Sequence, residues 1–277
     1  MEARAMIRAV APLVLTVLLV GCSDARRDTA ANDAAPGTTS SPAAAEERRL
    51  AYVALGASWQ YGTHCGMCET FVSYYATYVE EATGLPVDFD NRSTNGGGTA
   101  DFLATLREDE AARESVAQAD IVLIGGGTND LDRTGALEKV VAGTCGGEDG
   151  SRCLRAMARV WRRGFDAILD EVDELTAGRD VAVRLVGDQN VFLSDTSIIR
   201  DYGLPADFAL DGGELLIREQ SDAMAKVAQQ HGAEFVDVWR IFNGPAHDQP
   251  WDENSPEAHQ AVARALLDTG LVPLDLS

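Results

Sequence analysis

The sequence predicts an α/β fold in which helices form two layers around a five-stranded parallel sheet. Segments with the pattern of strands and segments with the pattern of helices alternate five times between residues 50 and 277. Such alternation is typical of parallel sheets, because a helix crosses over between successive strands. Glycine-rich turns follow two of the predicted strands, at the edge where open α/β sheets bind ligands.

The predicted strands are short apolar runs, and the predicted helices are longer segments with apolar residues on one face. The strands are residues 50–55, 87–89, 120–124, 181–186 and 234–238. The helices are residues 69–83, 99–118, 152–175, 213–230 and 256–267. Gly84 predicts the end of the first helix, and in the third the apolar residues recur every three or four positions. Ser255, Pro256 and Glu257 predict the start of the last helix as N-cap, first-turn proline and first-turn acid.

The first 49 residues have the pattern of an export signal followed by a tether. Arg4 and Arg8 precede an apolar run that is too short to span a membrane, which predicts a signal peptide over residues 1–21. The run ends in Leu-Val-Gly-Cys, a sequence similar to a bacterial lipobox, which implies cleavage before Cys22 and a lipid on its sulfur. The alternative is an ordinary cleaved signal in which Cys22 is incidental. Residues 22–49 lack apolar periodicity and predict a disordered linker, so 50–277 is the folded domain.

The chain is strongly acidic, with a formal net charge of −21, and removal of the signal peptide makes it one unit more negative. This charge argues against nucleic acid as a partner and against electrostatic adhesion to anionic lipid. We therefore expect the protein to be extracytoplasmic and held at the cell membrane by its lipid anchor alone. Its oligomeric state is not determined by any pattern in the sequence.

Four cysteines remain after Cys22, and in an exported protein they predict disulfides. The close spacings favour Cys65 with Cys68 and Cys145 with Cys153, although four cysteines allow three pairings. A four-cysteine zinc site is an alternative, but the second pair lacks the usual ligand spacing. A redox role for Cys65 and Cys68 is a further alternative, which needs an accessible thiolate of low pKa. We expect no metal and no cofactor.

Three turns place a candidate nucleophile and two candidate hydrogen-bond donors at the same edge of the sheet. Ser58 follows the first strand, and its hydroxyl is a candidate nucleophile. Asn129 follows the 120–124 strand and the glycines at 125–127, where its amide can donate to an oxyanion. Gly96 lies in a third glycine-rich turn, where a backbone N–H can approach a substrate oxygen. No lysine follows the glycines, which excludes a phosphate-binding loop.

The order and spacing of these turns resemble the SGNH, or GDSL, hydrolase family over nearly all of residues 50–277. Gly-Ala-Ser at 56–58, Gly96 and Gly-Thr-Asn-Asp at 127–130 fall on the family's first three blocks, and the tail is similar to that of secreted actinobacterial members. The resemblance implies a flavodoxin-like fold and an ester-cleaving activity. It also implies that Ser58 is the nucleophile and that the Ser58 N–H, the Gly96 N–H and the Asn129 amide form the oxyanion hole.

The chain departs from the family pattern at two places. The first block normally carries an acidic residue where Ala57 stands, and we expect its loss to loosen the turn that holds Ser58. The family also places an Asp-x-x-His pair before the last helix, where this chain has Asp-Glu-Asn-Ser at 252–255. Aligned through His259, the histidine position is Glu253, and aligned through Asp252 it is Ser255. Loss of this histidine costs about 10⁶-fold in turnover in other serine enzymes.

The chain has four histidines, of which two are candidates for the missing base. His247 lies in a loop near the predicted ligand-binding edge, and His259 lies inside the last helix, where a packing role competes with a catalytic one. Asp252 is a candidate to serve as the base or to orient it. His64 follows Ser58 closely, but a surface role is expected for it. His231 ends a helix, where a cation is favourable without further purpose.

Two functions from different classes follow. The first is an exported, lipid-anchored hydrolase that cleaves carboxylic esters or O-acyl groups, with impaired turnover if the histidine is not replaced. The second is a non-catalytic module that binds an ester, an acyl chain or an O-acetylated glycan in the same cleft. The segment 189–209 carries no recognisable signature, so the sequence does not identify the substrate.

Overall fold

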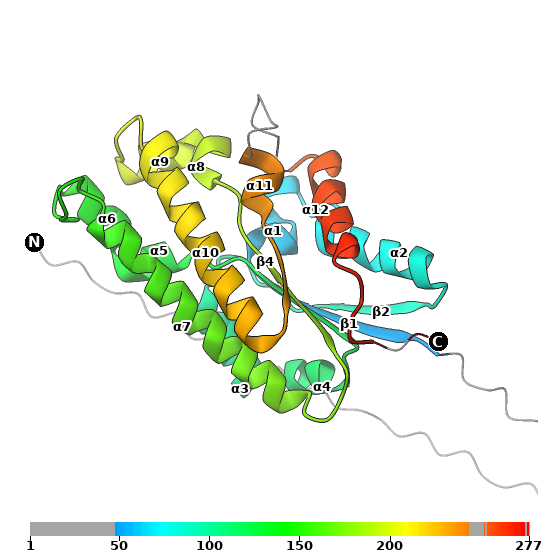
Figure 1. Ribbon diagram of the computed structural model, residues 1–277. Helices are drawn as coiled ribbons and strands as arrows, with labels where there is room; N and C mark the ends of the chain where they lie inside the picture. The colour runs from blue at the N-terminus through cyan, green and yellow to red at the C-terminus, as the bar shows by residue number, and fades with distance from the viewer. Residues whose placement is uncertain (1–47, 244–251, 253, 275, 277) are drawn as a thin grey trace, which may run out of the picture. The chain divides into compact units, whose positions relative to one another are not determined.

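The computed structural model describes residues 48–243, 252, 254–274 and 276 (Figure 1). The predictions for the signal peptide, for Cys22 and for the linker therefore lie outside the described residues. The same holds for His247, for Glu253 and for the side chain of His64. In the part of the chain that is described, no helix is both long and apolar enough to cross a membrane.

A five-stranded parallel sheet forms the centre of the domain and confirms the predicted fold class. The strands lie in the order β2-β1-β3-β4-β5, and every neighbouring pair is parallel. Their bounds are β1 Leu50–Leu55, β2 Val87–Asn91, β3 Ile121–Gly125, β4 Ala182–Val186 and β5 Glu234–Val236. Each strand lies within two residues of its predicted position, because the apolar runs that mark the strands are also the segments that the helices bury.

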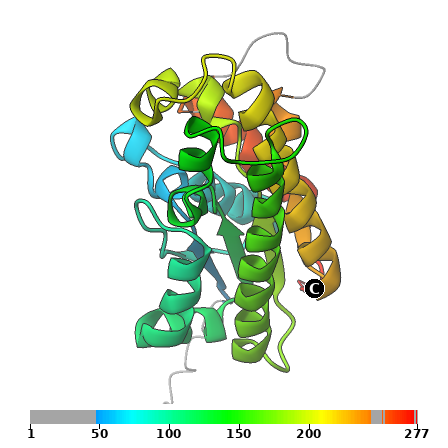
Figure 2. The same ribbon diagram turned by 90° about the vertical axis from the view of Figure 1, so that its left-hand side faces the viewer.

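Helices cover both faces of this sheet (Figures 1 and 2). One face carries α3, α4, α7 and α10, and the other carries α2, α11 and α12. The long helices are α2 Phe71–Thr83, α3 Thr99–Glu108, α4 Glu110–Gln118, α7 Arg152–Leu175, α10 Glu214–His231 and α12 Pro256–Asp268. Shorter ones are α1 Ser58–Tyr61, α5 Asp130–Thr134, α6 Ala136–Val141, α8 Val191–Ser194, α9 Thr196–Tyr202 and α11 Val238–Asn243.

Strand β1 shows how alternation along a strand builds two separate cores. Tyr52 and Ala54 point to the layer of α2 and α12, while Val53 and Leu55 point to the layer of α3, α7 and α10. All four are buried. Because both faces of the sheet are covered, the strand reads as a continuous apolar run rather than as an alternation of apolar and polar residues.

Helix α7 confirms the amphipathic helix predicted over the same residues. Its apolar stripe, which includes Trp161 and Phe165, is buried against the sheet and α10. The Trp161 indole also donates a hydrogen bond to the carbonyl of Gly127 at 2.9 Å. The helix therefore supports the turn that carries Asn129 as well as the core.

The single helix predicted over residues 99–118 is wrong in one respect, because the structure breaks it into α3 and α4. At the break, Asp109 has an extended backbone, and its carboxylate accepts a hydrogen bond from the Ala112 N–H at 3.1 Å. An aspartate that caps a new helix is favoured over one inside a helix. The segment 189–209, which carries no recognisable signature, contains α8 and α9, and it leads into one turn of π-helix at Ala209–Gly213 before α10.

Two disulfides confirm the favoured pairing of the cysteines. Cys65 is bonded to Cys68 and Cys145 to Cys153, with Cα–Cα distances of 5.4 and 4.8 Å. The first closes the loop between α1 and α2, and the second joins the segment after α6 to the first turn of α7. Because all four sulfurs are in disulfides, the alternative of a four-cysteine zinc site is wrong.

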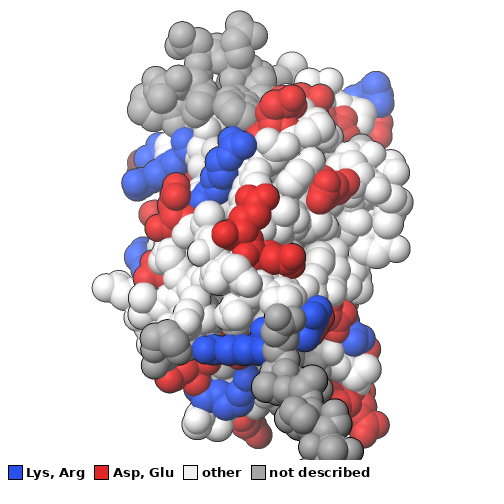
Figure 3. Space-filling model, turned by 90° about the vertical axis from the view of Figure 1, so that its right-hand side faces the viewer, with Lys and Arg blue, Asp and Glu red and all other residues white. Residues whose placement is uncertain are grey.

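The surface over α2 and α12 carries charges of both signs (Figure 3). Acidic and basic side chains are interspersed with uncharged ones, and the basic groups do not merge into one large patch on this face. The net negative charge of the chain is therefore not offset here by a basic surface of the kind that binds phosphate backbones.

Candidate active site

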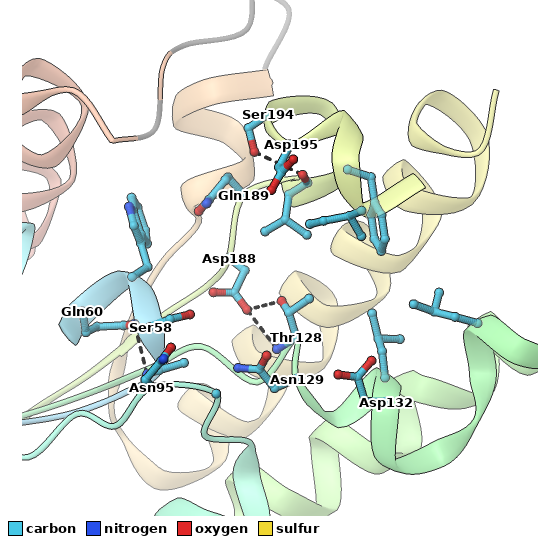
Figure 4. Close-up of a pocket in the computed structure, with 18 of the residues that line it drawn as sticks. Ser58, Gln60, Asn95, Thr128, Asn129, Asp132, Asp188, Gln189, Ser194 and Asp195 are labelled. Atoms are coloured by element: carbon cyan, nitrogen blue, oxygen red, sulfur yellow. Dashed lines mark hydrogen bonds between the residues drawn. The ribbon is translucent and has the colours of Figure 1, made fainter. Parts of the chain in front are cut away.

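Ser58 lies at the carboxyl edge of the sheet, in a cleft of about 510 Å³ (Figure 4). It is the first residue of α1 and follows directly on β1 and the Gly56-Ala57 pair. Gly96 and Asn129 line the same cleft. The structure therefore brings together the three residues that the sequence assigns to the nucleophile and the oxyanion hole.

The turn that presents Ser58 is held by the side chain of Gln60. The Ala57 N–H donates to Gln60 Oε1 at 3.1 Å, and the Gly62 N–H closes the turn onto the Ser58 carbonyl at 2.9 Å. Gln60 is fully buried, and its backbone carbonyl accepts hydrogen bonds from Thr70 Oγ1 and Asn91 Nδ2. The amide of Gln60 thus holds the turn that carries Ser58, a contact that no motif in the sequence indicates.

The turn at Gly96 requires glycine because of its backbone conformation and not because a side chain would clash with a neighbour. Gly96 has φ of +74°, and a Cβ placed on it would meet no atom within 4 Å. The next residue, Gly97, accepts a hydrogen bond from Asn129 Nδ2 at 2.9 Å. An amide nitrogen carries two hydrogens, so one fixes the Asn129 side chain and the second remains for a ligand in the cleft.

Asp130 fastens the same two turns to each other. Its carboxylate accepts from the Thr99 N–H at 3.1 Å and from Thr99 Oγ1 at 2.8 Å, with both residues buried. A Cβ on Gly98 would lie only 2.4 Å from Asp130 Oδ1, so the close approach requires glycine there. Burial raises the pKa of Asp130, although the hydrogen bonds from Thr99 oppose this shift. Asp130 therefore positions the oxyanion-hole candidates without lining the cleft itself.

The far wall of the cleft is apolar and comes from four short helices. Leu131 and Leu137 belong to α5 and α6, while Phe192 and Ile198 belong to α8 and α9. At the rim, the Tyr202 hydroxyl donates to Asp132, and this hydrogen bond raises the pKa of Tyr202 to about 12. An apolar wall beside a polar end with a nucleophile suits the acyl chain of an ester.

These turns match a known family in the comparison with protein-family models. The model described as the GDSL-like lipase/acylhydrolase family matches residues 54–260. The chain belongs to this family. The resemblance drawn from Ser58, Gly96 and Asn129 is thereby confirmed at the level of the family.

Solved structures of low sequence identity show the same fold. A lipase from a goat rumen metagenome is 24% identical, with a TM-score of 0.60, and covers 82% of this chain and 100% of its own. An extracellular lipase from Streptomyces rimosus is 18% identical, with a TM-score of 0.52 and coverage of 78% and 99%. A lipase/acylhydrolase from Enterococcus faecalis is 15% identical, with a TM-score of 0.53 and coverage of 82% and 99%. No curated protein sequence matches the chain.

In this member of the GDSL-like family, His259 lies in the core and does not line the cleft. Its side chain is fully buried against the rings of Trp59 and Phe71, on the same face of α12 as Val262 and Leu266. Its Nδ1 accepts a hydrogen bond from the Phe71 N–H at 3.2 Å. Burial lowers the pKa of His259 to about 4, so its imidazole is a weak base. The packing role weighed for His259 fits this position better than recruitment as the base.

The turn before α12 places the other candidates of this region. Asp252 is exposed, and its carboxylate accepts from the Asn254 N–H at 3.1 Å, so it shapes the turn and does not line the cleft. Asn254 does line the cleft. Ser255 caps α12 by accepting from the Ala258 N–H at 3.1 Å, and Pro256 occupies the first turn, which confirms the predicted start of this helix.

His231 lies far from this chemistry, at the end of α10. Its ring nitrogens contact the carboxylates of Asp173 at 2.8 Å and Asp166 at 3.2 Å, both on α7. Hydrogen bonds to these carboxylates raise its pKa, although burial acts in the opposite direction and is the largest single influence. His231 thus joins two helices, as its position at a helix end suggested.

The family member also has cleft residues that sequence reasoning missed. Asp188 and Gln189 follow β4 and line the cleft together with Ser58. Figure 4 shows the Asp188 carboxylate projecting into the cleft from the side opposite Asn95. The signal was available, because the rule that places ligands at the carboxyl ends of parallel strands applies to β4 as it does to β1 and β3.

Proposed function

We propose that this chain is an exported, lipid-anchored hydrolase that cleaves carboxylic esters or O-acyl groups through Ser58. The observation that carries the proposal is the convergence of Ser58, Gly96 and Asn129 on one cleft, with the amide of Asn129 fixed by Gly97. Membership of the GDSL-like lipase/acylhydrolase family supports an ester or acyl substrate.

The proposed reaction begins when the Ser58 hydroxyl attacks the ester carbonyl carbon and loses its proton to a base. The negative charge that develops on the carbonyl oxygen is stabilised by the N–H groups of Ser58 and Gly96 and by the Asn129 amide. Collapse of this intermediate releases the alcohol and leaves acyl-Ser58, which water then hydrolyses. The apolar wall that includes Leu137 and Phe192 accommodates the acyl group.

The test of this activity is hydrolysis of p-nitrophenyl acetate by the purified chain and by Ser58→Ala. We expect turnover that disappears in the variant. A fluorophosphonate probe provides a second readout, since it should label the wild-type protein with a 1:1 stoichiometry and leave the variant unlabelled. Equal hydrolysis rates for the two proteins would remove the proposal.

Attachment to the membrane is the second part of the proposal and rests on the lipobox ending in Cys22. Expression in a bacterium with Cys22→Ser as control tests it, with mass spectrometry of the mature N-terminus and partition into Triton X-114 as readouts. We expect the wild type to carry a lipid on Cys22 and to enter the detergent phase. A mature N-terminus without a lipid would contradict the anchor and leave the hydrolase proposal untouched.

A non-catalytic binding module is the second candidate function, and the position of His259 favours it. The described residues that line the cleft include no imidazole, because His259 is packed in the core against Trp59 and Phe71. Under this alternative the cleft retains an ester, an acyl chain or an O-acetylated glycan without turnover. Stoichiometric labelling of Ser58 by the fluorophosphonate would count against it.

A further inference from the structure

One carboxylate beside Ser58 is buried and yet open to the cleft. Asp188 is 7% exposed and follows β4, two strands away from β1 in the sheet. It lines the same cleft as Ser58, and Figure 4 shows its carboxylate between Ser58 and Thr128. A charged group in such a position is costly to maintain unless hydrogen bonds compensate.

Three donors hold one oxygen of this carboxylate and leave the other free. Asp188 Oδ2 accepts from the Thr128 N–H at 3.1 Å, from the Thr128 hydroxyl and from Gln220 Nε2 at 3.0 Å. None of the described residues donates to Oδ1. The bonds to Oδ2 therefore fix the orientation of the side chain, while Oδ1 keeps its lone pairs for a proton or a ligand.

The other titratable groups that line the cleft are already engaged at its rim. Asp132 accepts from the Tyr202 hydroxyl. Asp195 caps α9 by accepting from the N–H and the hydroxyl of Ser197. Among the described residues of the lining, Asp188 is thus the group with an unoccupied basic atom in the interior.

We propose that Asp188 is the general base for Ser58 in this chain, in place of the imidazole that other family members use. This inference rests on the proposed hydrolase function. The Ser58 proton passes to Asp188 Oδ1 as Oγ bonds to the ester carbonyl carbon. The protonated Asp188 then gives this proton to the departing alkoxide as its bond to the carbonyl carbon breaks. In the second half-reaction a water molecule loses a proton to Asp188, attacks acyl-Ser58 and releases the acid, and the proton returns to Ser58 Oγ.

Burial makes Asp188 a better base than an exposed aspartate. Desolvation raises the pKa of its carboxyl, although the bonds from Thr128 and Gln220 oppose the shift. The groups that face it from the β3 turn and from α10 are these two neutral residues, and the charged groups of the cleft, Asp132 and Asp195, lie at the rim. The active form is the carboxylate, so the rate falls as the pH drops through this pKa.

The experiment compares hydrolysis of p-nitrophenyl acetate between pH 4 and pH 9 by the full chain and six variants. Asp188→Asn retains an oxygen that can accept from Thr128, and we expect it to lower kcat about 10²- to 10⁴-fold. Asp201→Asn is the matched control, because Asp201 is an exposed carboxylate on α9 that does not line the cleft. It should leave the rate unchanged. Asp188→Ala should regain at least about tenfold of its lost rate when formate is added, in a saturable manner.

The pH profile separates a base from a purely structural residue. In the wild type we expect kcat/KM to have an acid limb, because protonation of the Asp188 carboxylate removes the base. In Asp188→Asn this limb should disappear. Asp188→Glu serves if the asparagine variant does not fold, and a tenfold or larger loss of kcat with the limb retained supports the role.

Two outcomes overturn the inference, and they differ from failure of the proposed function. If Ser58→Ala abolishes turnover but Asp188→Asn stays within about threefold of the wild type, Asp188 is not the base and the hydrolase proposal stands. An acid limb that persists in Asp188→Asn and vanishes in His247→Gln also excludes Asp188 as the base. If Ser58→Ala hydrolyses the ester as fast as the wild type, both the proposed function and the role of Asp188 fall.

Discussion

Removal of the Asp130 carboxylate tests whether the two oxyanion-hole turns are held by the bonds to Thr99. Asp130→Ala deletes the acceptor for the Thr99 N–H and for the Thr99 hydroxyl, both in a buried environment. A buried donor left without a partner costs about 1–3 kcal/mol. Two such donors give about 2–6 kcal/mol. Burial raises the pKa of Asp130, so the wild type already bears a desolvation penalty, and we expect the lower half of this range.

The matched comparison uses the two partners of the same contact. Thr99→Val removes only the hydroxyl bond and should cost about 1 kcal/mol. The loss of stability in the double variant should be smaller than the sum of the two single losses by about 1 kcal/mol. Each single variant already lacks the bond between the two side chains, so the sum counts that bond twice. Asp201→Ala, at an exposed position on α9, is the control and should change the free energy of unfolding by less than about 0.5 kcal/mol.

Urea denaturation followed by circular dichroism at pH 7 measures these differences, with an unchanged m value as the check on two-state behaviour. Hydrolysis of p-nitrophenyl acetate provides the functional readout, since Asp130→Ala frees the turn that orients Asn129. A free energy of unfolding within about 0.5 kcal/mol of the wild type, or full additivity in the double variant, would refute the reasoning about this contact.

Three further outcomes follow from the structure. Asn129→Ala should lower kcat about 10²- to 10³-fold with a small effect on KM, and an unchanged kcat would contradict its place in the oxyanion hole. The carboxylates around His231 raise its pKa above the unfolded value, so its stabilisation, about 1 kcal/mol or less, is complete below pH 6.5 and lost as the pH rises through the folded pKa. His231→Gln should therefore be destabilising at pH 5.5 and nearly neutral at pH 9, and equal effects at the two values would be inconsistent with this. Burial also raises the pKa of Asp188, so the folded protein favours the neutral form of this carboxyl. Asp188→Asn should therefore increase the thermal unfolding temperature at pH 8 relative to the wild type. This gain should vanish near pH 3.5, where the carboxyl is largely neutral in the wild type as well.

Local patterns were sufficient for the sheet, for α2, α7, α10 and α12, and for the disulfides. The run at residues 50–55 predicted β1 because a strand covered on both faces must be apolar throughout. The stripe that includes Trp161 predicted α7 because one face of the helix meets the core. The spacings of Cys65 with Cys68 and of Cys145 with Cys153 favoured the observed pairs, since close cysteines meet without a long-range fold.

Patterns of this kind were insufficient where a side chain bonds to the backbone or where helices are short. The break between α3 and α4 depends on Asp109 as a cap, which competes with a continuous helix over the same residues. The short helices α8 and α9 have too few turns to show periodicity, and the tertiary contacts around the cleft stabilise them. The support of the Ser58 turn by Gln60 follows from a close approach of side chain and backbone that no spacing rule contains.

The sequence by itself determined that Ser58, Gly96 and Asn129 meet at one edge of a sheet, because alternating strands and helices predict a parallel sheet and the turns after its strands lie at the carboxyl edge. Tertiary structure decided which titratable groups share the cleft with them. His259 is packed into the core against Trp59 and Phe71, while Asp188 opens into the cleft. Burial and the geometry of hydrogen bonds set the basicity of both groups, and these arise only when segments far apart in the chain are brought together.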